Sequence, residues 1–303
     1  MIYYTGDIHG EPNGIVKFAK QFHLSNEDTI VILGDVGANY YGGDRDRLMK
    51  EKLKQVKANI LCIHGNHEKR PSTISTYGTK EWKGGVVWYE TDFPNLLFAK
   101  DGEVYDIEGI RHLVIGGAYS VDKWYRLRRG WGWWDDEQVP EERRVEILEE
   151  VKRIKSVDLV LTHTCPYEWE PRELFLSGLD QSTVDDSMEH WLSEIEANLE
   201  YRYWLFGHFH GDKKINDKAQ MLYKDVIYLE FLKSHNPWKR EVAYGLMNLP
   251  YLQRDKILKD FGLIKLEEYG IDHRELLLTI INRVENNNKV KEISEAISHA
   301  KGV

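Results

Sequence analysis

The sequence is short of cysteine, of long apolar runs and of internal repeats, and these shortages exclude several classes of protein. Only two cysteines occur in 303 residues. Cys62 and Cys165 lie far apart in strand-like surroundings, so we expect reduced packing thiols and no disulfide. No run of about 18 apolar residues and no charged-then-apolar leader is found, which favours a cytoplasmic protein that does not contact a membrane.

Positive charges are outnumbered by negative ones. Lysine and arginine number 41 against 50 aspartate and glutamate residues, and the formal net charge is -9. Because affinity for polyanions comes mainly from clustered Lys and Arg, we expect no extended nucleic-acid interface. The hydrophobic fraction of 42% is sufficient for a large core, either in one domain or in a domain with an appendage.

The first 70 residues repeat one local pattern, in which a short apolar run is followed by polar residues and then by helical spacing. The apolar runs are 2–4, 29–33 and 59–63, and the helical segments are 14–22 and 48–56. Repeated strand-loop-helix units predict a mostly parallel sheet whose ligands gather outside the carboxyl ends of its strands.

Side chains that can bind a metal follow these runs. Asp7 and His9 come first, and on an extended backbone residues two apart point to the same side. Two later apolar runs, 159–163 and 203–206, also end in histidines. The complete set of candidate donors is Asp7, His9, Asp35, Asn66, His163, His208 and His210.

The donor set predicts a centre with two metal ions. Imidazole mixed with carboxylate and amide oxygen suits borderline divalent ions such as Mn²⁺, Fe²⁺ or Zn²⁺. Seven donors are too many for one tetrahedral ion and fit two ions if Asp35 bridges them. Two ions roughly 3.5–4 Å apart can hold a phosphate and lower the pKa of a water molecule. Singly, each histidine is more often a packing residue, so the interpretation depends on all five motifs together.

The middle of the chain has a different pattern. Short alternating segments joined by Gly, Asp and Pro turns predict a second, mixed or antiparallel sheet. These segments are 86–89, 96–98, 104–107 and 113–117, and helices are predicted over 141–155 and 189–198.

Residues 119–136 form a predicted loop of unusual composition, with four tryptophans and three arginines. It could be a lid in which Trp124 stacks on a planar leaving group while Arg126 offsets negative charge. Equally, the rings could pack against the edge of the second sheet. The acidic residues 135–137 follow directly and favour a small substrate over duplex nucleic acid.

Five short motifs resemble those of the calcineurin-like metallophosphoesterase superfamily. They are GDIHG at 6–10, GD at 34–35, GNHE at 65–68, TH at 162–163 and GHFH at 207–210. The resemblance implies an α/β fold, in which two packed mixed sheets flanked by helices make a four-layer α/β/β/α sandwich. It also implies a dinuclear centre and in-line attack by a metal-bridging hydroxide.

The same resemblance assigns roles to individual residues. One ion would be held by Asp7, His9, Asp35 and His210, and the other by Asp35, Asn66, His163 and His208. Asn66 and His67 would also contact the phosphate. His67 would protonate the leaving oxygen or stabilise the transition state.

The chain departs from the branch that its motifs resemble most, the serine/threonine phosphatases and symmetrical diadenosine tetraphosphate hydrolases. That branch continues its second motif as GDxVDRG. Here Ala38 replaces the aspartate that partners the motif-three histidine, and Asn39 replaces a phosphate-binding arginine. His64 stands where another arginine precedes GNHE. The nearest basic residues are Arg45, Arg47, Lys69 and Arg70, each expected to be a solvated surface charge.

The sequence divides into a metallophosphoesterase domain over residues 1–235 and a helical extension over 236–303. Apolar stripes over 252–263 and 275–284 predict helices that pack on the core or form a homo-oligomer with a second subunit.

We predict a metal-dependent phosphoesterase that hydrolyses phosphomonoesters or phosphodiesters. We expect both ions to be Mn²⁺, with Fe, Zn, Ni or Mg as alternatives. The phosphorylated substrate is expected to be small or nucleotide-like, or a phosphoprotein. The alternative is a catalytically weak metal-binding interaction or scaffolding module on the same fold.

Overall fold

Short runs of β-branched and aliphatic residues form the strands of two sheets. The computed structural model describes residues 1–178, 180–228, 242, 245–246, 248–262, 284 and 287–301, without the side chains of residues 251, 287 and 288.

The first sheet has seven strands in the order β13-β1-β2-β3-β6-β5-β4. Strands β1, β2, β3 and β6 run parallel, and β13, β5 and β4 are antiparallel to their neighbours. Their bounds are β1 Ile2–Thr5, β2 Thr29–Ile32, β3 Asn59–Cys62, β4 Gly78–Trp82, β5 Gly85–Tyr89, β6 Leu96–Ala99 and β13 Val226–Tyr228. The parallel arrangement brings the carboxyl ends of β1, β2 and β3 to one edge.

The second sheet has six strands in the order β11-β12-β10-β9-β8-β7. Strands β8, β9, β10 and β12 are parallel, and β7 and β11 are antiparallel edges. Their bounds are β7 Val104–Ile107, β8 Ile110–Ile115, β9 Leu159–Thr162, β10 Tyr203–Phe206, β11 Lys213–Lys214 and β12 Ala219–Met221.

The prediction that the middle segments form a single second sheet is wrong. Strands β5 and β6 belong to the first sheet, and only β7 and β8 belong to the second. The reason is pairing: β6 is buried on both faces and adds in parallel beside β3, and β5 then folds back on β6.

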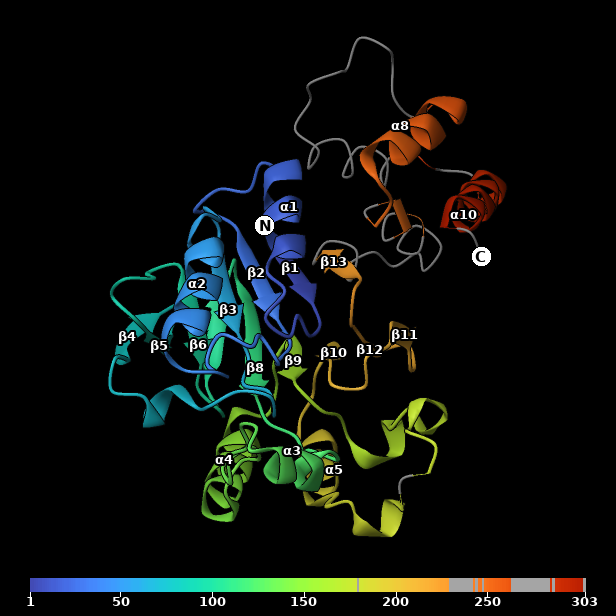
Figure 1. The fold of residues 1–303 in the computed structure, drawn as a ribbon. Coiled ribbons are helices and arrows are strands. Elements are labelled where there is room, and N and C mark those ends of the chain that lie inside the picture. Colours follow the sequence, from blue (N-terminus) through green and yellow to red (C-terminus); the bar gives the residue numbers. More distant parts are fainter. Residues whose placement is uncertain are drawn as a thin grey trace.

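Helices cover the outer face of each sheet (Figure 1). Their bounds are α1 Asn13–Gln21, α2 Gly43–Lys54, α3 Lys123–Arg129, α4 Glu141–Ile154, α5 Ser187–Asn198, α8 Tyr251–Asp260 and α10 Asn287–Lys301. Short 3₁₀ turns occupy Pro71–Thr73, Tyr167–Trp169, Arg172–Leu174 and Gln181–Thr183. None of the helices described is long and apolar enough to cross a membrane.

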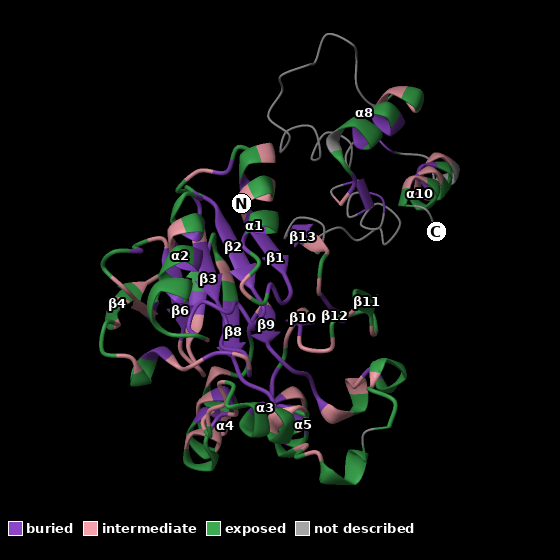
Figure 2. Ribbon diagram, viewed as in Figure 1, coloured by how far each residue is buried: buried purple, intermediate pink, exposed green. Residues whose placement is uncertain are grey.

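Alternation along the strands separates three layers of apolar side chains. In β1, Tyr3 packs with the helices outside the first sheet, whereas Ile2 and Tyr4 pack in the layer between the sheets. A third cluster joins the second sheet to α4 and α5. Figure 2 shows the strands as the most buried part of the molecule. This is the predicted four-layer α/β/β/α sandwich.

Helix α2 begins at Gly43, earlier than the predicted Leu48. Asp46 explains the difference, because its carboxylate accepts hydrogen bonds from the amides of Tyr41 (3.0 Å) and Gly42 (2.7 Å) and so orders the entry to the helix. The segment 119–136, predicted to be a loop, contains helix α3.

The C-terminal helices α8 and α10 contribute to the outer core of the first sheet. Leu258 of α8 and Ile293 of α10 are buried in the cluster that contains Ile15 and Phe22. The predicted domain boundary at residue 235 and most of the predicted stripe 275–284 lie outside the described residues. The division into two domains therefore stays a prediction.

Candidate metal centre and adjoining pocket

The seven predicted donors come from loops that follow five parallel strands. Asp7 and His9 follow β1, Asp35 follows β2, and Asn66 follows β3 in the first sheet. His163 follows β9, and His208 and His210 follow β10 in the second sheet. The centre therefore lies where the carboxyl edges of the two sheets meet.

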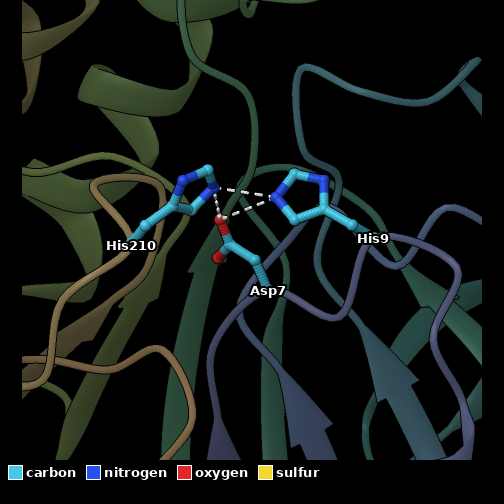
Figure 3. Close-up of side chains that lie close together, drawn as sticks. All are labelled: Asp7, His9 and His210. Carbon is cyan, nitrogen blue, oxygen red and sulfur yellow. Dashed lines mark hydrogen bonds and ion pairs between the residues drawn. The ribbon is translucent and has the colours of Figure 1, made fainter. Parts of the chain in front are cut away.

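Asp7, His9 and His210 converge on one point (Figure 3). The Nε2 atoms of the two histidines are 2.8 Å apart, and Oδ2 of Asp7 lies 3.4 Å from Nε2 of His210 and 3.8 Å from that of His9. The extended backbone expected for Asp7 and His9 is not what brings them together. The φ angle of His9 is 44°, so a turn directs its ring to the carboxylate.

Asp35 lies between two groups of donors. Its Oδ1 is 3.6 Å from Nε2 of His163, and its Oδ2 is 3.8 Å from Nε2 of His9. The backbone amide of His67 donates a hydrogen bond of 2.7 Å to Oδ1 and fixes the carboxylate. Each carboxylate oxygen thus faces a different imidazole, which is the geometry a bridging ligand requires.

Asn66 connects two further histidines. Its Oδ1 lies 2.9 Å from Nε2 of His163 and 3.1 Å from Nδ1 of His208. The other ring nitrogen of His163 donates to the carbonyl of Leu33 at 2.7 Å. That bond orients the ring so that Nε2 is directed at Asn66 and Asp35, the orientation in which this nitrogen would bind a metal once it is deprotonated.

Glycines in the motifs leave room for donors of other motifs. A Cβ atom at Gly207 would lie 2.4 Å from Oδ1 of Asp7, and one at Gly65 would lie 2.1 Å from Oδ1 of Asp35. Each contact is closer than real Cβ atoms approach another heavy atom. The glycines of the GHFH and GNHE motifs therefore have a steric role in the centre.

The charges of the centre suit a bound cation. Asp7 and Asp35 are fully buried, and within the part of the chain that the structure describes Oδ2 of Asp7 has no hydrogen-bond partner. Among the described residues, no lysine or arginine forms an ion pair with either carboxylate. Although burial alone would raise the pKa of Asp35, His163 and the other nearby imidazoles hold it well below its usual range. Because buried carboxylates need compensating charge, the donors fit divalent ions.

His67 lies next to this centre but makes no side-chain hydrogen bond within the described part of the chain. Its ring centroid is 5.2 Å from that of His9 and 6.4 Å from that of Tyr40, with Tyr40 nearly parallel to it. Burial lowers its pKa; Asp35 opposes this shift and the charge of Arg126 adds to it. The lowered pKa favours the neutral imidazole, which has to take up a proton before it can donate one to a bound substrate.

Arg126 supports the centre from behind, a role that sequence reasoning missed. Its side chain is 1% exposed and donates to Oγ of Ser120 (2.9 Å) and to the carbonyls of Gly132 (2.8 Å) and Asn66 (3.3 Å). Ser120 in turn accepts from Nδ2 of Asn66 at 2.9 Å. This chain of bonds turns Oδ1 of Asn66 toward the histidines. Trp124, the other residue predicted to contact substrate from this segment, is 65% exposed.

Asn39 and His64 stand where the phosphatases that the motifs resemble have arginines, and both residues are buried. Asn39 accepts a hydrogen bond of 3.0 Å from the hydroxyl of Tyr77, and His64 is 3% exposed. Arg70 is bonded to the carboxylate of Asp101 and to a backbone carbonyl. Because the side chains of Asn39, His64 and Arg70 contact the protein interior, the positive charge that binds a substrate has to come from other residues.

A cavity of about 710 Å³ adjoins the centre. His9 and His67 line it together with Tyr40, Tyr41 and Arg45, which follow β2, and with Trp131, which follows α3. Arg45 is exposed, as predicted for a surface charge, and it also lines the cavity, whereas the sequence analysis singles out neither tyrosine. The adjacent aromatic and basic residues directly after the second motif were the available signal.

The chain resembles known proteins in structure and in sequence. Among solved structures, the chain is similar to TT1561 of Thermus thermophilus, with 14% identity over 73% of this chain and 87% of that chain and a TM-score of 0.43. It is also similar to a phosphopantetheinyl hydrolase from Mycobacterium tuberculosis, with 13% identity over 78% of this chain and 92% of that chain and a TM-score of 0.37. No curated protein matches the sequence. Residues 1–212 match a family model described as calcineurin-like phosphoesterase, a range that includes all seven donors.

Proposed function

The chain belongs to the calcineurin-like phosphoesterases, and on that basis we propose that it hydrolyses phosphomonoesters or phosphodiesters with two bound divalent ions. The observation that carries the proposal is the position of Asp35. This buried carboxylate directs one oxygen toward His163 and the other toward His9. Two groups of donors that share one carboxylate fit two ions better than one.

The proposed ligands divide into two sets around this carboxylate. Asp7, His9, Asp35 and His210 would hold one ion, and Asp35, Asn66, His163 and His208 the other. When bound, the two ions would neutralise phosphate charge and lower the pKa of a water molecule. We propose that both ions are Mn²⁺, with Fe, Zn, Ni and Mg as alternatives.

The remaining steps use side chains of the protein. A water molecule loses a proton to the solvent and its oxygen bonds to phosphorus, while the bond from phosphorus to the leaving oxygen breaks. His67 donates a proton to that leaving oxygen, and Asn66, held by Ser120 and Arg126, also contacts the phosphate. The products are a phosphate and an alcohol, or a phosphomonoester and an alcohol when the substrate is a diester.

A panel of substrates tests the proposal. Metal-depleted protein is assayed on a phosphomonoester and a phosphodiester after addition of Mn²⁺, Fe²⁺, Ni²⁺, Zn²⁺ or Mg²⁺. We expect hydrolysis that depends on the added ion, with the highest rate in Mn²⁺. Tight metal binding without turnover of any substrate would instead favour a metal-binding scaffolding module, the competing function.

A further inference from the structure

The cavity beside the metal centre is larger than a phosphoryl group needs. Its volume of about 710 Å³ lies within the range of pockets that hold whole small-molecule ligands. His9 belongs to the centre, His67 lies next to it, and both line this cavity. A substrate whose phosphorus lies at the donors would therefore extend its leaving group into the cavity on the side of His67.

The lining of the cavity includes aromatic rings that are not packed into the hydrophobic core. Tyr41 is 61% exposed and Trp131 is 53% exposed, although both are large rings. They come from separate segments of the chain, one after β2 and one after α3. Tyr40 adds a third ring, nearly parallel to that of His67. Rings left uncovered beside a polar centre are available to stack on a ligand.

Arg45 supplies the positive charge of this cavity. Its guanidinium lies 4.7 Å from the ring centroid of Tyr41, a distance typical of a cation–π contact. It is the one lysine or arginine among the lining residues that the structure describes. The fork of guanidinium donors suits acceptor atoms on a flat ring, the mode by which arginine recognises bases.

We propose that this cavity, the aromatic pocket, binds the leaving group of the substrate and that this group carries a planar heteroaromatic ring, as a nucleoside does. The proposal rests on the function proposed above, which places the phosphoryl group at the donors. In the reaction, the oxygen of a water molecule bonds to phosphorus, the bond from phosphorus to the leaving oxygen breaks, and the leaving group departs as an alcohol with a proton that replaces the one lost by the water. A phosphorylated serine or threonine side chain has no ring to place against Tyr41 and Trp131.

Binding of the leaving group alone tests this proposal without requiring turnover. Adenosine and, as the control without a base, ribose are titrated into the full-length protein by calorimetry, with and without Mn²⁺. We expect adenosine to bind at least about tenfold more tightly than ribose, because each stacked base typically contributes that much or more. Equal affinity for the two compounds would overturn the proposal.

Variants then locate the bound adenosine. Tyr41→Ala, Trp131→Ala and Arg45→Ala should each weaken adenosine binding by about tenfold, whereas Tyr41→Phe, which keeps the ring, should stay near wild type. Arg47→Ala is the matched control. Arg47 lies on helix α2, as Arg45 does, but its side chain is 65% exposed and pairs with Glu51 outside the cavity. Adenosine affinity that is the same in wild type and in all three alanine variants would place the ligand elsewhere and contradict the assignment.

The outcome is separable from that of the proposed function. Adenosine binding lost in the alanine variants supports the aromatic pocket even if no phosphoester is hydrolysed. Metal-dependent hydrolysis with no preference for adenosine over ribose leaves the phosphoesterase proposal standing and overturns the pocket.

Discussion

Asp35 is the residue through which both proposed ions are connected. The substitution Asp35→Asn keeps the size of the side chain but removes the charge that would offset two cations. We expect it to reduce metal-dependent hydrolysis by at least about tenfold more than Asn66→Ala, which removes a ligand of one ion. Steady-state rates at saturating Mn²⁺ measure the difference. An equal or milder loss in Asp35→Asn would show that another residue is the bridge.

His67 separates metal assembly from chemistry. Its ring is not among the seven donors, so His67→Ala should retain the metal content of the wild type. With a poor leaving group such as an alkyl alcohol, the loss should be about 10²–10⁴-fold, the usual range for a positioned acid. With p-nitrophenolate the loss should be smaller, because that oxygen departs without a proton.

The position of His67 bears on this expectation. Ala38 stands where the resembled phosphatases have an aspartate partner, and it is fully buried. Without that carboxylate, the ring of His67 packs against His9 and Tyr40 and makes no side-chain hydrogen bond to any residue that the structure describes. A loss that does not vary with the pKa of the leaving group, with both ions retained, would leave His67 as a stabiliser of charge and not a proton donor.

At the scale of elements, close packing between loops should control metal binding as much as the ligands do. The substitution Gly207→Ala would place a methyl group 2.4 Å from Oδ1 of Asp7 and 2.8 Å from the carbonyl of Leu33. We expect a metal content below that of wild type and a stability loss of about 1–3 kcal/mol, typical of overpacking. Elemental analysis and denaturant unfolding measure the two effects.

Gly14→Ala is the matched control for this substitution. Gly14 lies in helix α1, and a Cβ atom there would meet no atom within 4 Å. Alanine should be neutral or stabilise the helix by up to about 1 kcal/mol, with metal content unchanged. If Gly207→Ala behaved like this control, the steric account of the GHFH loop would be wrong.

The sequence predicts individual strands and helices better than it predicts which strands pair with one another. Buried runs such as 29–33 and 59–63 identify strands because no other short element needs so many β-branched and aliphatic residues. The donors are also predictable, since each follows such a run. Short alternating segments do not say which sheet they join, so the membership of β5 and β6 was missed. The role of Arg126 and the cavity beside Tyr41 depend on contacts between distant segments, which a local pattern does not contain.

At the scale of the whole molecule, the proposed ions would join the two sheets. Asp7, Asp35 and Asn66 come from the first sheet, whereas His163 and His210 come from the second. An ion bound only by the folded arrangement stabilises it by mass action. Bound metal should therefore raise the unfolding temperature as well as permit hydrolysis.

The central claim is that seven donors at the junction of the two sheets hold two divalent ions in each chain. The direct measurement is elemental analysis of protein that has been depleted of metal, reconstituted with Mn²⁺ and freed of excess ions. We expect two ions per chain, together with a higher unfolding temperature than that of the depleted protein. Reconstituted protein that retains no more than trace metal would contradict the claim.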